Sequence, residues 1–184
     1  MAGRPVFRWR SPRPVLLPAC GHRLICREAA AAFPAEACGL LLGSGLQIRR
    51  LLPMINQAAD PDRFEIAPSD LFTAHRQARG EGMAVIGHYH SHPNGLAGPS
   101  LRDAEAIADP SALWLIAAVS PEIGQVAGVS AWYPVLWSPA AVSSAPENAA
   151  YHPVDYQGNH RFRRACLLRV RRLQPADSKK ADDL

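Results

Sequence analysis

Residues 87–103 contain side chains that can bind a metal ion together. His90 and His92 lie two positions apart, and side chains at this spacing in an extended strand face the same side. Asp103 lies three positions after Ser100, which places both side chains on one face of a helix. A loop that returns this helix to the end of the strand would bring two imidazoles and one carboxylate together, with a fourth position left for water. This is the ligand set of a catalytic zinc site rather than a structural one.

Each part of this pattern also has a simpler interpretation. Two histidines near the end of a strand are, by themselves, more often hydrogen-bonded loop residues than metal ligands. Ser100 and Asp103 also form the sequence pattern of a capping box at the start of a helix. His88 could offer a third imidazole on the same strand face, but we interpret it as a neighbour of the site. The residue types leave the metal open, because two His and one carboxylate also bind iron and other divalent ions.

The complete pattern resembles the motif of the JAMM (MPN+, Mov34/JAB) zinc metalloprotease family. It reads H-x-H-P, six further residues and S-x-x-D, with an upstream Glu close to a Gly-Leu-Leu strand. The resemblance implies that one Zn²⁺ per chain is bound by His90, His92 and Asp103. It also implies that Glu36 is the catalytic base and that Ser100 donates a hydrogen bond to the developing oxyanion.

This resemblance implies a zinc metallopeptidase or isopeptidase. Zinc lowers the pKa of bound water toward ~7 and polarises the substrate carbonyl. Glu36 would take the proton of the water and deliver it to the leaving amine. The sequence E-A-C-G-L-L-L-G at residues 36–43 is similar to the small bacterial branch of the family. By resemblance, the substrate is the C-terminal Gly-Gly tail of a ubiquitin-like or sulfur-carrier protein, bound as an extended strand in a narrow groove.

Two other functions compete with this hypothesis. The first is a noncatalytic MPN-type scaffold that mediates protein assembly and binds no metal. The presence of all three ligands together with Glu36 and Ser100 favours the enzyme over the scaffold. The second is a zinc deaminase of related architecture, but the H-x-E and P-C-x-x-C signature of that class is absent from the sequence.

The elements around the motif predict an α/β domain with a mixed sheet flanked by helices. Helices are expected over residues 22–33, 69–80 and 100–107, and strands over residues 38–43, 46–55, 84–90, 113–119 and 125–135. Ser69 or Asp70 is expected to cap the second helix. The order αββαβαββ favours the mixed sheet. The family resemblance, which covers roughly residues 20–135, implies a cytidine-deaminase-like α/β/α sandwich, the JAB/MPN domain.

Length and charge define the expected domain organisation. The 184 residues suffice for one ordinary domain, which we place at residues 15–139. Residues 1–14 are a basic, Pro-rich tail with four Arg and no acidic residue, and residues 140–184 are a low-order, Arg-rich extension. Residues 15–160 contain eight Arg and thirteen acidic residues, so the folded body is acidic. This distribution argues against a nucleic-acid partner.

Composition also bears on the compartment. No apolar stretch approaches the ~20 residues of a membrane-spanning helix, so no membrane partner is expected. The four Cys at positions 20, 26, 38 and 166 have no C-x-x-C spacing, which signals neither a disulfide framework nor a structural zinc cluster. Cys38, close to the candidate site, is interpreted as a small buried hydrophobe. These features predict a cytoplasmic protein.

Overall fold

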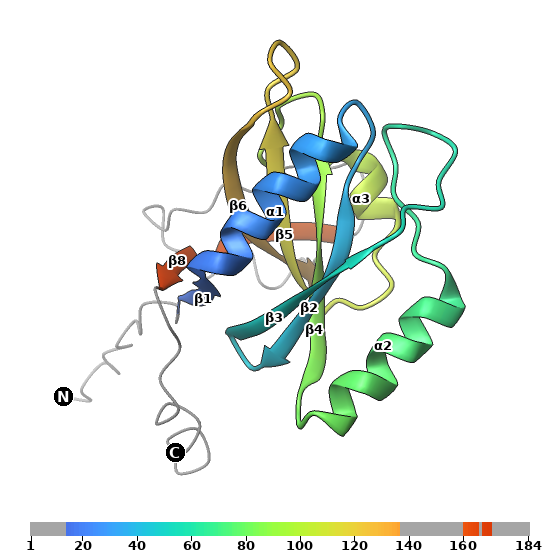
Figure 1. The fold of residues 1–184 in the computed structure, drawn as a ribbon, viewed down its shortest axis with the longest axis vertical. Helices are drawn as coiled ribbons and strands as arrows, with labels where there is room; N and C mark the ends of the chain where they lie inside the picture. The colour runs from blue at the N-terminus through green and yellow to red at the C-terminus, as the bar shows by residue number, and fades with distance from the viewer. Residues whose placement is uncertain (1–13, 137–159, 166, 171–184) are drawn as a thin grey trace, which may run out of the picture.

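A computed structural model of the chain describes residues 14–136, 160–165 and 167–170. Within these residues the fold consists of helices that pack on the two faces of a single sheet (Figure 1). The strands are β1 (Val15–Pro18), β2 (Cys38–Ser44), β3 (Gln47–Met54), β4 (Ala84–His92), β5 (Leu113–Val119), β6 (Val126–Leu136), β7 (His160–Ala165) and β8 (Leu167–Val170). The helices are α1 (Ala19–Ala32), α2 (Pro68–Gly80) and α3 (Leu101–Glu105).

The sheet has the strand order β7-β6-β5-β4-β2-β3-β1-β8. β2 lies antiparallel to both β3 and β4, β5 lies antiparallel to β6, and β6 lies antiparallel to β7. β4 and β5 are parallel, as are β1 and its neighbours β3 and β8. The prediction of a mixed sheet flanked by helices is therefore confirmed.

The sheet curves around α1. β7 and β8 lie at opposite edges of the sheet, yet only residue 166 separates them in the chain. Since consecutive Cα atoms are 3.8 Å apart, the two edges must come close together. α1 contacts β1, β3, β4, β5, β6 and β8 across this curved face, and Figure 1 shows it running along the front of the sheet. Its buried residues Ile25 and Ala29 pack in one apolar cluster with Leu41 of β2 and Leu115 of β5.

The opposite face of the same strands packs against the two other helices. Successive side chains of a strand point to opposite faces, so Leu40 and Leu42 of β2 contact α2 rather than α1. In the same way Trp114 and Ile116 of β5 pack against Ala104 of α3. All seven residues of β5 are buried, as expected for a strand that is covered on both faces.

The structure differs from the sequence prediction at the edges of the sheet. β1, β7 and β8 were not expected, and β7 and β8 fall within residues 140–184, the predicted low-order extension. The sheet thus continues past the predicted domain end at residue 139. The side chain of Phe162 in β7 is fully buried, where it packs against Trp114 and Trp132. A single buried apolar residue among arginines does not produce the alternation by which strands are recognised in a sequence.

Two helix boundaries also differ from expectation. The prediction that Ser69 or Asp70 caps α2 is wrong, because the helix begins at Pro68 and its N-cap, Ala67, forms no side-chain cap. Proline at the first helical position has a preorganised φ angle and needs no hydrogen-bond acceptor for its nitrogen. α3 is also shorter than predicted and ends at Glu105. None of the helices in the described part of the chain is long and apolar enough to cross a membrane.

Candidate metal centre and active site

β4 carries the candidate ligands to one face of the sheet. Tyr89 points into the apolar cluster under α1, so the alternation of the strand places its neighbours His88 and His90 on the opposite face. His92, the last residue of β4, follows on that same face. The ladder with β5 pairs His90 with Ile116 and His92 with Ala118. The pairing of β4 with β5 therefore fixes the backbone of both histidines.

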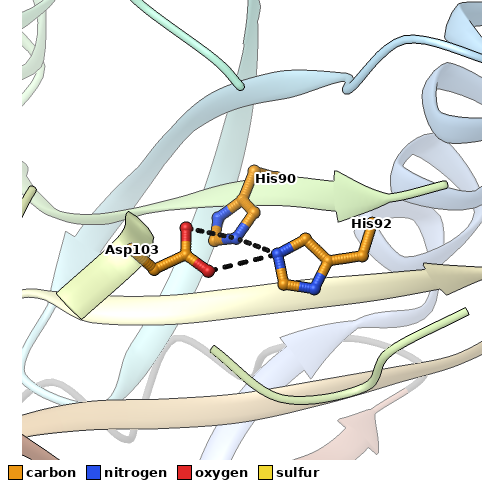
Figure 2. A group of neighbouring side chains, drawn as sticks. All are labelled: His90, His92 and Asp103. Carbon is orange, nitrogen blue, oxygen red and sulfur yellow. Dashed lines mark hydrogen bonds and ion pairs between the residues drawn. The ribbon is translucent and has the colours of Figure 1, made fainter. Parts of the chain in front are cut away.

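The side chains of His90, His92 and Asp103 converge on one point (Figure 2). The two Nε2 atoms lie 3.1 Å apart. Asp103 Oδ1 lies 3.4 Å from His90 Nε2, and Asp103 Oδ2 lies 3.2 Å from His92 Nε2. Ligand atoms at ~2.0–2.1 Å from a tetrahedral Zn²⁺ lie ~3.3–3.4 Å from one another. The three separations therefore fit a zinc ion with little movement of the side chains.

The tautomer of His92 also fits a metal ligand. His92 Nδ1 lies 3.0 Å from the carbonyl oxygen of Leu96, to which its N–H donates. In the neutral ring this proton leaves Nε2 free to bind a metal, whereas in the metal-free protein Nε2–H donates to the ionised Asp103. A metal-binding histidine commonly donates its other ring N–H to a carbonyl in this way. The Nδ1 atom of His90 is buried and has no hydrogen-bond partner among the described residues.

The start of α3 orients the aspartate. Ser100 is the N-cap of this helix, and its Oγ accepts a hydrogen bond of 3.2 Å from the backbone N–H of Asp103. Asp103 Oδ2 in turn accepts a hydrogen bond of 2.5 Å from the backbone N–H of Ser100. The capping box considered in the sequence analysis is therefore present, and the same aspartate also faces the histidines. The hydroxyl hydrogen of Ser100 is not used in this box and has no acceptor among the described residues.

Glu36 lies beside this cluster and is only 6% exposed. It precedes β2 by two residues, and its backbone N–H donates to the carbonyl oxygen of Pro61 over 3.1 Å. Its own carbonyl accepts a hydrogen bond of 3.0 Å from Asn56 Nδ2. The next residue, Ala37, donates its N–H to Ser91 Oγ over 2.8 Å and accepts from the N–H of Ser91 over 2.9 Å. Ser91 therefore ties the segment of Glu36 to the strand between the two histidines.

The pKa values of Glu36 and Asp103 are shifted in opposite directions. Burial raises the pKa of Glu36 to about 8; the nearby His92 opposes this shift, and the negative charges of Asp103, Asp62 and Asp60 add to it. Burial would also raise the pKa of Asp103, but its hydrogen bonds to the two histidines hold that pKa well below the usual range. A carboxyl group with a pKa near neutrality is suited to accept and release a proton, whereas a permanently ionised one is suited to bind a cation.

The pKa values of the three histidines on this strand also differ, because their surroundings differ. Burial lowers the pKa of His90 despite its contact with Asp103, so this imidazole is neutral at physiological pH. Burial acts on His92 in the same direction, but its hydrogen bond to Asp103 prevails and raises the pKa. Burial together with the neighbouring His90 lowers the pKa of His88 to about 3. A neutral imidazole is the form that binds a metal.

A cavity of about 530 Å³ opens next to the cluster. Its lining includes Glu36 and Asp103, as well as the apolar side chains of Phe64 and Trp114. This size lies within the range of ~300–1,000 Å³ typical of ligand sites. The cavity therefore reaches Glu36 and Asp103, while His90, His92 and Ser100 lie outside its lining.

Three residues at the site were missed by the sequence analysis. Ser91 stands inside the H-x-H-P motif but had no assigned role. Asn56 and Phe64 belong to a loop between β3 and α2, and Phe64 stacks on the ring of His90 with centroids 4.8 Å apart. Neither residue is part of a pattern whose spacing indicates a site. Cys38, expected to be a small buried hydrophobe, is 2% exposed, and burial together with Glu36 raises the pKa of its thiol to about 12.

The mixed sheet and the buried cluster at the end of β4 define an α/β domain with a two-histidine, one-aspartate site compatible with a metal. Residues 18–134 match the family model described as prokaryotic homologs of the JAB domain. The chain belongs to this family, as the resemblance of its motif implied.

Three curated relatives match this chain over 44–50% of its length. The desampylase of Haloferax volcanii is 34% identical over 94 residues, which are 49% of this chain and 68% of that protein. The desampylase of Pyrococcus furiosus is 31% identical over 81 residues, 44% of this chain and 58% of that protein. The probable TtuB-protein conjugate cleaving protease of Thermus thermophilus is 37% identical over 93 residues, 50% of this chain. The chain spans 58% of the length of each of the last two proteins.

Solved structures support the same fold. A protein from Desulfitobacterium hafniense is 30% identical with a TM-score of 0.56, and the match covers 64% of this chain and 82% of that one. A protein from Salinibacter ruber is 25% identical with a TM-score of 0.54, and the match covers 84% of this chain and 90% of that one.

Proposed function

We propose that this chain is a zinc-dependent peptidase or isopeptidase that binds one Zn²⁺ through His90, His92 and Asp103. The observation that carries this proposal is the convergence of two Nε2 atoms and one carboxylate at mutual separations of 3.1 to 3.4 Å. Bound zinc supplies a Lewis acid and makes water a nucleophile near neutral pH. The remaining steps are assigned to residues of the chain itself.

Glu36 is the proposed general base and acid. Its carboxyl group lines the cavity together with Asp103, and its pKa of about 8 in the metal-free site allows both protonation states near neutrality. It takes a proton from the attacking water and then delivers this proton to the nitrogen of the leaving amine. The hydroxyl of Ser100 donates to the oxyanion that develops on the substrate carbonyl.

The proposed substrate is a ubiquitin-like or sulfur-carrier protein with an extended C-terminal Gly-Gly tail. The family and the names of the relatives, which include desampylase and a probable TtuB-protein conjugate cleaving protease, support this class. Extended backbone with glycine at each position passes through a narrow groove that side chains would obstruct. We place the catalytic residues within residues 15–139, in a domain whose sheet is completed by β7 and β8. We place the protein in the cytoplasm, in keeping with the free thiols of Cys20, Cys26 and Cys38.

A cleavage assay tests this function. The substrate is a ubiquitin-like sulfur-carrier protein whose Gly-Gly tail is joined to a lysine side chain of a reporter, and the products are identified by mass spectrometry. Zinc-loaded protein is expected to release the carrier with an intact Gly-Gly end, to lose this activity with a chelator and to regain it with added zinc. A carrier with the tail changed to Val-Val is the matched control and is expected to resist cleavage. Failure of the zinc-loaded protein to cleave the Gly-Gly conjugate would contradict the proposal.

A further inference from the structure

The amide of Asn56 uses its full hydrogen-bonding capacity. Nδ2 donates to the carbonyl oxygens of Glu36 over 3.0 Å and Arg63 over 2.8 Å. Oδ1 accepts from the N–H groups of Ala58 over 2.9 Å and Glu65 over 3.0 Å. A primary amide offers two N–H donors and two acceptor lone pairs, so this side chain holds both ends of the loop over residues 57–65 and links the loop to Glu36.

The backbone of Glu36 depends on this loop. The residue lies outside β2, which begins at Cys38, so the sheet ladder does not hold it. Its N–H donates to Pro61, and its carbonyl accepts from Asn56. Both partners belong to the segment that Asn56 closes, which is also pinned by a backbone hydrogen bond of 2.9 Å from Gln57 to Glu65. Displacement of this segment would therefore remove both backbone hydrogen bonds of Glu36 and leave its chain held by the bonds of Ala37 to Ser91.

The same loop reaches the other parts of the site. Phe64 stacks on His90 with an interplanar angle of 20°. Asp60 forms an ion pair of 3.0 Å with Arg102, the neighbour of Asp103 on α3. One loop thus contacts the segment of the proposed base, a proposed ligand and the helix that carries the aspartate.

We propose that Asn56 is a positioning residue that holds the Glu36 carboxyl group in place for proton transfer. This inference rests on the function proposed above. The hydrogen bonds of Asn56 go to Glu36 and the loop rather than to the proposed metal ligands, so it acts through the backbone of Glu36. A catalytic group displaced by about 1 Å can lose on the order of 100-fold in rate, so the effect falls on kcat more than on KM.

The variant Asn56→Asp tests this role. It retains the oxygen that accepts from Ala58 and Glu65 but loses the N–H groups that donate to Glu36 and Arg63. It also adds one negative charge, for which Gln57→Glu is the matched control. Gln57 is the next residue, is exposed, and its side chain makes no hydrogen bond in the described part of the chain. Both variants therefore change an amide to an acid at the same place, and only one removes the link to Glu36.

The first measurement is hydrogen exchange of the Glu36 amide in metal-free protein, which needs no activity. Loss of a hydrogen bond corresponds to roughly a tenfold change in an equilibrium, and Asn56→Asp loses two. Exchange at least about tenfold faster is therefore expected in Asn56→Asp, and no change in Gln57→Glu. Equal exchange in wild type and Asn56→Asp would overturn the inference. In wild type, the side-chain N–H groups of Asn56 should exchange slowly. Fast exchange there would overturn the inference even if the variant did not fold.

The second measurement is hydrolysis at matched zinc content. Asn56→Asp is expected to lower kcat about tenfold or more with little change in KM, whereas Gln57→Glu keeps both. When Glu36 is already replaced by Gln, Asn56→Asp should have no further effect on residual hydrolysis, because the group that it positions is gone. An equal loss in both backgrounds would indicate a merely structural role. A wild-type protein without hydrolysis would contradict the proposed function, while the exchange measurement would still decide the role of Asn56.

Discussion

Tyr89 and His90 are neighbours on β4, yet they face two very different surroundings. Tyr89 packs under α1 in an apolar cluster that extends from β1 to β6. His90 lies on the opposite face among Phe64, Trp114, His92 and Asp103. The same backbone thus supplies a packed core on one side and a cluster of polar side chains on the other.

The difference between the faces follows from what covers them. α1 is a helix of 14 residues that lies along the curved sheet and excludes water from that face. The other face is covered by α2, the five-residue α3 and connecting loops, and a cavity of about 530 Å³ remains between them. Loops on a rigid scaffold commonly carry functional residues. We therefore expect substitutions under α1 to affect stability and those on the other face to affect metal binding and hydrolysis.

We call the face that carries His90 and the cavity the cavity face. On this face, the largest expected effect on hydrolysis is that of Glu36→Gln. The amide has a similar shape but cannot accept the proton of water, and loss of general acid–base catalysis costs typically 10²–10⁴-fold in rate. Hydrolysis should fall by about this factor while zinc content stays at the wild-type value. A variant that retained full activity would refute the role of Glu36, and loss of zinc would make it a ligand instead.

Neighbouring residues of β5 offer a direct comparison of the faces. Leu115 and Ile116 are both 0% exposed, but Leu115 packs under α1 and Ile116 packs against Ala104 of α3. Truncation of either to alanine should cost about 2–5 kcal/mol in the free energy of unfolding. Only Ile116→Ala should also weaken zinc binding, because it loosens the helix that carries Asp103. Urea unfolding and a zinc titration measure both effects, and equal zinc affinity in the two variants would remove this distinction.

The pH dependence of the free energy of unfolding reports on the buried carboxyl group of Glu36. In metal-free protein, the pKa of Glu36 is raised from 4.5 to about 8, so between these values the folded state binds one more proton than the unfolded state. Stability from this group is complete below about pH 4.5 and is lost as pH rises toward about 8. At ~1.4 kcal/mol per pKa unit, the loss is of the order of a few kcal/mol. Urea unfolding of chelator-treated wild type should show this decline relative to Glu36→Gln, and parallel curves would contradict it.

The smallest effect is expected at the outer ion pair of the cavity face. Arg102 and Asp60 are joined over 3.0 Å, but their side chains are 57% and 44% exposed. Exposed pairs of this kind contribute about 0–1 kcal/mol. Arg102→Gln should therefore change the free energy of unfolding by less than about 1 kcal/mol and leave zinc content unchanged. A loss of several kcal/mol in thermal or urea unfolding would show that the pair holds the loop more strongly than its exposure indicates.

Sequence patterns predicted the central strands well. Residues 113–119 form β5 with the expected bounds, and the apolar run between Gly39 and Gly43 lies within β2. These strands are buried on both faces, so they appear as continuous apolar runs. The edge strands β7 and β8, and β1 next to β8, were missed because they are short and their partners are distant in the sequence. Sheet edges of this kind are defined by tertiary pairing more than by local pattern.

In the site, too, contacts between residues close in the sequence were predictable, and contacts between distant residues were not. The separations within residues 90–103 predicted that His90, His92 and Asp103 could converge, and the structure brings those three side chains together. The role of the loop over residues 57–65 was not predictable, because Asn56 lies 20 positions from Glu36 in the chain and its contact with Glu36 exists only in the fold. The raised pKa of Glu36 arises in the same way from burial and distant charges.

Metal content tests the central claim most directly. Wild-type protein and His92→Ala are purified side by side, reconstituted with zinc, freed of excess metal and measured by elemental analysis, with circular dichroism to confirm folding. We predict one zinc per chain in the wild type and nearly none in folded His92→Ala, because the variant loses one of three ligands that converge within 3.4 Å. A wild type that binds no zinc, or a folded variant that retains it in full, would contradict the account and favour the scaffold.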